Sequence, residues 1–190
     1  MPRRPSYNRD DLIERARDVF WQQGWSGTSL KDLERILDLR PGSFYAAFGS
    51  KEALYELALD TYAQQGFERL KTLARKIGPL EALKAHPKLV ITNKQNAAKA
   101  CMLAKTFLEL HAQKHPLAER ASAHLSRMEM LFSELFQQAQ AAGEIGAQHK
   151  PSGLARRYQS DLLGMRISAE RNEFDAQAIA EELSANLTNL

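Results

Sequence analysis

Helix signals follow one another along this chain, and the alternation of apolar and polar residues that is typical of strands is almost absent. The pattern begins with Leu12, Ala16, Val19 and Phe20, which repeat at helical spacing. A chain of 190 residues, of which 44% are hydrophobic, is long enough to bury a sizeable core. These features predict an all-α fold.

The first 48 residues predict three short helices. Asn8 suits the N-cap of the first helix, and Gly24 suits its C′ position. Either Thr28 or Ser29 can cap the second helix, and Ser29 has an acidic residue three positions later, as in a capping box. Pro41 stands where proline is favoured, at the first position of a third helix.

The third helix, in the stretch "RPGSFYAAFGSK" at residues 40–51, is barely two turns long. A rotation of about 100° per residue places Phe44, Phe48 and Pro41 on one side, with Tyr45 at its edge. A helix that presses its backbone against the bases of a DNA major groove needs small residues on its other side. A short helix packed on both faces inside a helical domain is the alternative. The small residues of the other side are Gly42, Ser43, Ala46 and Ala47.

Lys51 stands in the first turn of the following helix, where a positive charge is unfavourable for the helix dipole. A phosphate group would explain it, because Lys51, Thr28 and the Tyr45 hydroxyl can hold a DNA backbone on both sides of the short helix. An ordinary half-buried tyrosine and a solvated lysine are the alternatives. The first 60 residues hold 9 Lys and Arg against 10 Asp and Glu, so a DNA-binding face must come from local placement.

The segment "TSLKDLERILDLRPGSFYAAFGSKEALYELAL", residues 28–59, resembles the helix-turn-helix of the TetR family of bacterial transcriptional repressors. The resemblance rests on the Thr-Ser opening, the glycine and small hydroxyl residue of the short helix, its aromatic pair, Phe48 and the "SKEAL" entry to the next helix. It implies that Thr28, Tyr45 and Lys51 contact phosphates. It places a further set at or near the bases: Lys31, Arg40, Pro41, Gly42, Ser43 and Phe44.

One departure from the family concerns Ala47, where many members carry a histidine. One backbone contact common in the family is therefore missing, which leaves more of the affinity to Lys51 and to the arm carrying Arg3 and Arg4.

The resemblance also implies two domains, a DNA-binding domain at residues 1–50 and an effector-binding and dimerisation domain at residues 51–190. Helical patterns within the second are interrupted at "AHPKLVITNKQN", which we interpret as a loop after a brief helix in "GPLEAL". Further helices are predicted from Lys51 to about Lys76, in "AAKACMLAKTFLELHAQKH", from there to near Gly143, and in a terminal hairpin.

The two terminal helices resemble the pair that joins two copies of the chain in the family. Their apolar stripes favour a homodimer, since pairing of identical surfaces would cover them. Packing within a single chain is the alternative. The stripe residues are Leu154, Tyr158, Leu162, Met165, Ile179 and Leu183.

A second apolar set suggests a pocket for a small, largely apolar effector, although ordinary core packing explains the same residues. Cys101 belongs to this set and lies between Lys99 and Lys105, which favours a reactive thiolate. The apolar residues after it favour a buried cysteine that behaves as a small hydrophobe. The pocket candidates are Cys101, Phe107, Met128, Phe132, Tyr158 and Met165.

The sequence argues against catalysis, metal binding and a cofactor. Cys101 and His111 would lie about 15 Å apart on one helix, too far for a nucleophile and its base. His111 and His115 have the spacing of metal ligands, but Ala112 stands where a zinc hydrolase carries glutamate, and no third ligand is evident. No glycine-rich phosphate loop occurs.

A single cysteine excludes an intramolecular disulfide, and neither an apolar run near 18 residues nor a signal peptide is present. We therefore expect a cytoplasmic protein without a membrane partner. The function expected is that of a homodimeric repressor that binds a near-palindromic DNA operator and is released by a small molecule. Release by oxidants or electrophiles through Cys101 is an alternative, and a helical enzyme or protein-interaction module is a second one from another class.

Overall fold

The computed structural model describes residues 8–94, 96–171 and 175–188, so the arm with Arg3 and Arg4 lies outside the described residues. Within them the chain is all-α, as predicted. It forms α1 (Arg9–Gln23), α2 (Leu30–Leu37), α3 (Pro41–Phe48), α4 (Lys51–Ile77), α5 (Pro79–Thr92), α6 (Met102–Leu110), the 3₁₀ helix η1 (His111–Gln113), α7 (Pro116–Ala141), α8 (Pro151–Ser168) and α9 (Ala176–Asn186).

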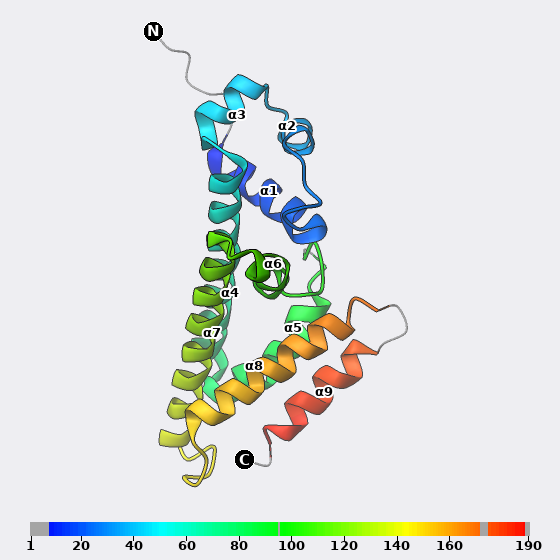
Figure 1. Cartoon of the computed structure of the whole chain (residues 1–190). Coiled ribbons are helices and arrows are strands. Elements are labelled where there is room, and N and C mark those ends of the chain that lie inside the picture. The colour runs from blue at the N-terminus through cyan, green and yellow to red at the C-terminus, as the bar shows by residue number, and fades with distance from the viewer. Residues whose placement is uncertain (1–7, 95, 172–174, 189–190) are drawn as a thin grey trace.

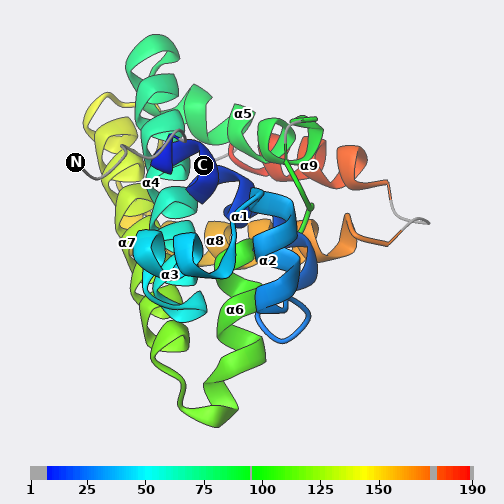
Figure 2. The same ribbon diagram turned by 90° about the horizontal axis from the view of Figure 1, so that it is seen from above.

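Two long helices, α4 and α7, run side by side along the molecule (Figure 1). Helices α1 to α3 gather at one end, and α8 and α9 lie toward the other (Figure 1). Helix α9 also packs on α5 (Figure 2). Helix α6 lies between the two ends and packs on α4 and α7. One continuous hydrophobic core joins side chains of all these helices.

The predicted helix ends of the first three helices are confirmed. The Asn8 side chain accepts a hydrogen bond from the backbone N–H two residues later, at 3.0 Å. Ser29 and Asp32 form a complete capping box, so Ser29 and not Thr28 is the N-cap of α2. Pro41 is the first residue of α3, where its missing N–H costs nothing.

Helix α3 is held by two aromatic side chains, Phe44 and Phe48, which are 0% and 6% exposed. Tyr45 is 52% exposed, so it lies at the edge as expected. The assignment of Pro41 to the buried side is wrong, because this residue lies at the free end of the helix and is exposed. Ala47 is half-buried and packs against the core, which narrows the small-residue face.

The loop predicted at residues 85–96 is wrong over most of its length, because α5 continues to Thr92 through Pro87. Proline lacks the N–H that would bond to the carbonyl group of Leu83. The Tyr158 hydroxyl on α8 donates to that carbonyl at 2.8 Å instead. A tertiary hydrogen bond therefore satisfies the group that the proline leaves free.

The helix predicted over "AAKACMLAKTFLELHAQKH" is also shorter than expected, because residues 97–101 are not helical and α6 begins at Met102. The N–H groups of Lys99 and Ala100 donate to the Glu170 carboxylate at 2.7 and 2.6 Å. Contacts distant in sequence thus replace the hydrogen bonds of a helix.

The anchoring of α3 predicts a sharp contrast between neighbouring aromatics. Phe44→Ala is expected to lower the free energy of unfolding by about 3–5 kcal/mol, because it leaves a cavity in the core. Tyr45→Ala is expected to lower it by about 1 kcal/mol or less, because its ring is half exposed and only touches Phe44 at its edge. Denaturant unfolding of both variants checks this, and equal losses would contradict it.

Candidate DNA-binding surface and effector cavity

The outer face of α3 exposes backbone rather than long side chains. Gly42 and Ala46 are exposed, and Ser43 is half-buried. A Cβ atom added at Gly42 would meet nothing within 4 Å, and Gly42 lies in a regular helix. Nothing in the described chain therefore requires glycine here, although glycine in a helix costs about 1 kcal/mol relative to alanine.

Positive side chains flank this face. Lys31 on α2 and Arg40 at the start of α3 are both exposed, as a role in DNA contact requires. Arg9, which no sequence pattern singles out, places its guanidinium 5.4 Å from the ring centroid of Phe48. Arg9 and Arg40 therefore place positive charge at α3 even though the segment as a whole is nearly balanced in charge.

Three of the residues predicted to contact DNA are buried or bonded within the chain. Thr28 is 1% exposed, and its hydroxyl donates to the carbonyl group of Gly24 at 2.8 Å, so it does not face solvent. Phe44 is fully buried and acts as an anchor, not as a reader of bases. The Lys51 ammonium donates to the Trp25 carbonyl at 2.6 Å and lies 4.0 Å from the indole centroid. This contact gives its unusual first-turn charge a partner, and burial lowers the Lys51 pKa.

Helix α6 holds the turn between α1 and α2. The Glu109 carboxylate accepts from the backbone N–H groups of Trp25 at 3.0 Å and Ser26 at 2.7 Å. Lys105 donates to two carbonyl groups in the last turn of α1, at 2.7 and 3.1 Å. Gly24 has φ +77°, a conformation that favours glycine, and a Cβ there would lie 2.8 Å from Glu109 Oε2 and would displace that carboxylate. Burial raises the Glu109 pKa, but these hydrogen bonds and Lys105 outweigh it and hold the pKa below 4.5.

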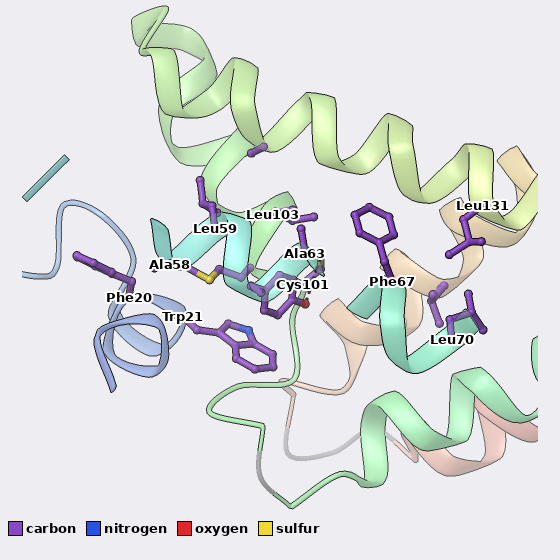
Figure 3. Close-up of a cluster of buried hydrophobic side chains, with 14 of the residues drawn as sticks. Phe20, Trp21, Ala58, Leu59, Ala63, Phe67, Leu70, Cys101, Leu103 and Leu131 are labelled. Atoms are coloured by element: carbon purple, nitrogen blue, oxygen red, sulfur yellow. Dashed lines mark hydrogen bonds between the residues drawn. The ribbon is translucent and has the colours of Figure 1, made fainter. Parts of the chain in front are cut away.

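A cavity of about 710 Å³ lies in the helical body, bounded by α4, α5, α7, α8 and the segment before α6. Cys101, Met128 and Phe132 line it, as the effector-pocket prediction requires. Figure 3 shows part of this region, with Trp21 near Cys101 and Phe67 further along α4. The volume falls within the range of ligand sites, which is about 300–1,000 Å³.

Phe107, Tyr158 and Met165 do not line the cavity, and this part of the prediction is wrong. Phe107 faces away and stacks on His111, with ring centroids 4.6 Å apart. Tyr158 and Met165 are 4% and 2% exposed and pack within the core. Apolar helix faces look alike in sequence whether they line a cavity or fill a core, which explains the error.

Polar cavity residues were not predicted. Arg166 on α8, 8% exposed, donates to the carbonyl groups of Lys99 at 2.8 Å and Ala100 at 3.4 Å. Gln159 donates to the carbonyl group of Leu125 at 2.9 Å, while its Oε1 is buried without a partner in the described chain. The only sequence signal was the arginine inside the apolar run "LLGMRI".

His86 also lines the cavity. Its tautomer follows from its contact with the Tyr158 hydroxyl. The Tyr158 hydroxyl has one proton and donates it to Leu83, so the contact of 3.2 Å to His86 Nδ1 requires Nδ1 to be the donor. His86 Nε2 is then an acceptor. Burial, together with the charges of Arg166 and Arg69, lowers the His86 pKa to about 3, so the ring is neutral.

The predicted dimer residues divide into two groups. Three of them pack inside a single chain, so their prediction as residues of the dimer interface is wrong. They are Tyr158, Leu162 and Met165, which are 4%, 6% and 2% exposed. The others, Leu154, Ile179 and Leu183, are half-buried. On α8 the exposed residues near its end include Gly164 and Ile167, the latter 50% exposed.

Cys101 is 7% exposed and receives a long hydrogen bond from the Tyr62 hydroxyl, with 3.7 Å between oxygen and sulfur.

His115 caps α7, since its Nδ1 accepts from the Leu117 N–H at 3.2 Å. No group of three metal-ligating side chains occurs in the part of the chain that the structure describes. Among the helices of the described residues, none is long and apolar enough to cross a membrane.

Three short helices that end in an exposed, cation-flanked α3, joined to a helical body with a cavity, form the arrangement of a helix-turn-helix transcriptional regulator. The family model of bacterial regulatory proteins, tetR family, matches residues 12–58. A second model, of a tetracycline-repressor-like C-terminal domain, matches residues 79–170. The chain belongs to the TetR family and is a DNA-binding transcriptional repressor, not an enzyme.

Relatives and solved structures agree with this assignment. The chain is 27% identical to the HTH-type transcriptional repressor ComR of Escherichia coli (strain K12) over 171 residues, 86% of this chain and 80% of ComR. It is similar to a cysteine mutant of the TetR family regulator CifR, bound to a 26 bp operator duplex, with TM-score 0.80, 26% identity and 97% of each chain covered. A TetR family regulator from Cytophaga hutchinsonii, with 20% identity, shares the fold at TM-score 0.84 over 94% of this chain and 92% of that one.

The Glu109 contact predicts a pH-dependent contribution to stability. Because the folded pKa lies below 4.5, the stabilisation is complete above that value and is lost as the pH falls through the folded pKa. Glu109→Gln is expected to cost about 1 kcal/mol near pH 7 and almost nothing at an acid pH below the folded pKa, where the carboxylate is protonated. Urea unfolding at both pH values measures this. Glu134→Gln, a change at an exposed glutamate of α7, is the control, and a pH-independent loss in Glu109→Gln would contradict the prediction.

Proposed function

We propose that this repressor works as a homodimer that binds a near-palindromic operator in the cytoplasm and is released by a small molecule. Residues 1–50 act as the DNA-binding domain, and residues 51–190 hold the effector and join the two copies. The observation that carries the proposal is Gly42, an exposed helical glycine that nothing in the described chain requires. Close approach of a DNA surface supplies the missing reason.

The DNA contacts we propose are those whose side chains or backbone are accessible. Gly42 and Ser43 approach the bases, while the Tyr45 hydroxyl and the cations of Lys31 and Arg40 contact the backbone or base edges. Pro41 lies between these groups and is exposed as well. The Lys51 ammonium has three N–H donors, so it can contact a phosphate while one of them stays bonded to the Trp25 carbonyl, which holds the side chain in place.

Release by a small molecule is supported by the position of α6. Cys101 and Leu103 at its beginning line the cavity, and Glu109 near its end bonds the turn that leads into α2. A molecule that displaces the cavity wall therefore acts on the helix that holds the DNA-binding end. Effector and operator binding are then coupled, typically by about 1–3 kcal/mol in such systems.

Pairing of two copies is supported by the exposed end of α8. Ile167 is 50% exposed, and a Cβ added at Gly164 would meet nothing within 4 Å. A small residue beside an exposed apolar one allows a second helix to approach closely. Half-buried Ile179 and Leu183 on α9 extend the apolar surface. Two identical surfaces of this kind are self-complementary about a twofold axis.

Gly42→Leu tests the DNA-binding proposal. Specific operator affinity is expected to fall at least about tenfold, because the side chain keeps α3 away from the bases. Thermal stability is expected to stay equal or rise, because leucine favours a helix more than glycine does. Titration of an operator duplex, mapped by footprinting DNA beside the gene, and of a scrambled duplex at several salt concentrations measures the change.

The matched control for this experiment is Gly153→Leu, the same substitution at an exposed glycine of α8, which is expected to leave operator binding unchanged. Unaltered operator affinity of a folded Gly42→Leu protein, or unfolding of that variant, would contradict the proposed role of this face.

Ile167→Glu tests the dimer. Two carboxylates brought into an apolar twofold interface are expected to weaken dimerisation by about 2–4 kcal/mol, and operator affinity falls with it. Sedimentation velocity over a concentration series gives the dissociation constant. Leu108→Glu, the same change at a side chain of α6 that is 70% exposed, is the control. If both variants remained dimeric to the same extent, α8 would not form the interface.

A further inference from the structure

The cavity contains a buried cation, Arg166, that forms no direct ion pair with a carboxylate in the described part of the chain. The Arg166 guanidinium bonds to the carbonyl groups of Lys99 and Ala100, and no ion pair involves it within the described residues. Glu170, the acid that acts on it electrostatically, already accepts hydrogen bonds from the two backbone N–H groups of that segment. Neither the carbonyl groups nor the N–H groups carry net charge, so Glu170 keeps its negative charge and offsets part of the Arg166 charge without forming an ion pair with it.

A second guanidinium, that of Arg69 on α4, also lines the cavity and forms neither a hydrogen bond nor an ion pair with the described part of the chain. Lys76 is a third cation of the lining, and Glu68 is its only carboxylate. The Glu68 side chain is exposed and accepts a hydrogen bond from Gln64 at 3.0 Å. The lining therefore carries more positive than negative charge.

Both arginines lie close enough to His86 in the cavity wall to affect it electrostatically. Burial lowers the His86 pKa most, and the charges of Arg166 and Arg69 lower it further. A histidine that could add a further positive charge is thus kept neutral. The Tyr62 hydroxyl, whose pKa burial raises, is also neutral and donates its one proton to Cys101 Sγ.

The remaining wall is largely apolar and includes Leu70, Leu73, Val90, Leu103, Met128 and Phe132. A ligand matched to this wall has an apolar body of several rings or a chain. A ligand matched to the charges carries one acidic group. Both features are needed at once, since a polar anion leaves the wall unfilled and a neutral apolar molecule leaves the arginines without a counter-charge.

We propose that the cavity binds an amphipathic organic anion, with its apolar body against this wall and its carboxylate, sulfonate or similar acidic group at Arg69 and Arg166. The assignment rests on the proposed function, because it takes the cavity to be the effector site. Charge-assisted hydrogen bonds from planar guanidinium groups suit such an oxyanion.

Two fluorescent probes with one aromatic skeleton test the charge preference. Anilinonaphthalenesulfonate is an amphipathic anion, and phenylnaphthylamine is its uncharged analogue. The full-length protein, without DNA, is expected to bind the sulfonate at least about tenfold more tightly at low salt. The difference is expected to shrink as salt is added, because exposed Arg69 at the cavity is screened. Equal affinity for the two probes would overturn the proposal.

Three variants locate the interaction. Arg69→Gln is expected to weaken sulfonate binding about fivefold and leave phenylnaphthylamine binding unchanged, because only the acidic group contacts the guanidinium. Arg75→Gln removes the same charge from the same helix at a residue that does not itself line the cavity and is expected to change neither. Gly66→Leu fills the cavity, where an added Cβ would meet only the flexible end of Met128 at 3.5 Å, and is expected to weaken both probes.

Equal losses in Arg69→Gln and Arg75→Gln, or unchanged binding of both probes in Gly66→Leu, would show that the probes bind outside the cavity and would overturn the assignment. Operator retention is measured separately, with and without the sulfonate. Sulfonate binding that depends on Arg69 but never releases the operator would contradict ligand release while supporting the anion site.

Discussion

The peptide groups of Lys99 and Ala100 are the point on which the rest of the structure depends. They lie in a non-helical segment inside a helical protein, so their polar groups need partners from elsewhere. Glu170 accepts from both N–H groups, and Arg166 donates to both carbonyl groups. The Trp21 indole donates to the Ala100 carbonyl at 2.6 Å. One short segment thus ties α1, in the DNA-binding end, to α8, in the opposite end.

The direction of α6 follows from this arrangement, since the helix begins immediately after the segment. Its first residues form part of the cavity wall, and Lys105 and Glu109 lie one and two turns further along. Their opposite charges are used for opposite groups: the ammonium binds carbonyl groups at the end of α1, and the carboxylate binds N–H groups of the turn that follows. A single helix therefore lines the cavity at its beginning and, further along, bonds the end of α1 and the turn that leads into α2.

The sequence predicted elements whose signals are local. Caps at Asn8 and Ser29, the proline at the start of α3 and the aromatic anchor of that helix were confirmed, because each depends on residues within a few positions. The accessible backbone at Gly42 follows from the same short pattern. For the DNA-binding end, sequence and local chemistry were therefore nearly sufficient, except where a side chain such as Thr28 had an internal partner.

The errors arose where distant residues decide the outcome. The helix through Pro87 depends on a hydroxyl 71 positions away, on Tyr158. The break before α6 depends on Arg166 and Glu170. No local pattern contains these contacts. The helix-forming tendency of residues 97–101 was therefore overestimated, and so was the helix-breaking effect of Pro87. The polar lining of the cavity was missed for the same reason, since Gln159 and Arg69 look like ordinary surface residues of amphipathic helices.

Three features lower the stability of the isolated chain, and no stabilising contact within the chain accounts for them. Gly42 weakens α3 by about 1 kcal/mol relative to alanine. The buried Oε1 of Gln159 lacks a donor, which costs about 1–3 kcal/mol. Arg166 keeps a buried charge without a direct ion pair in the described part of the chain. Chains tolerate such conflicts where a binding partner resolves them. One of these three lies on the face proposed for DNA and two line the cavity proposed for the anion, so the local costs fall on the two surfaces where ligands are expected to offset them.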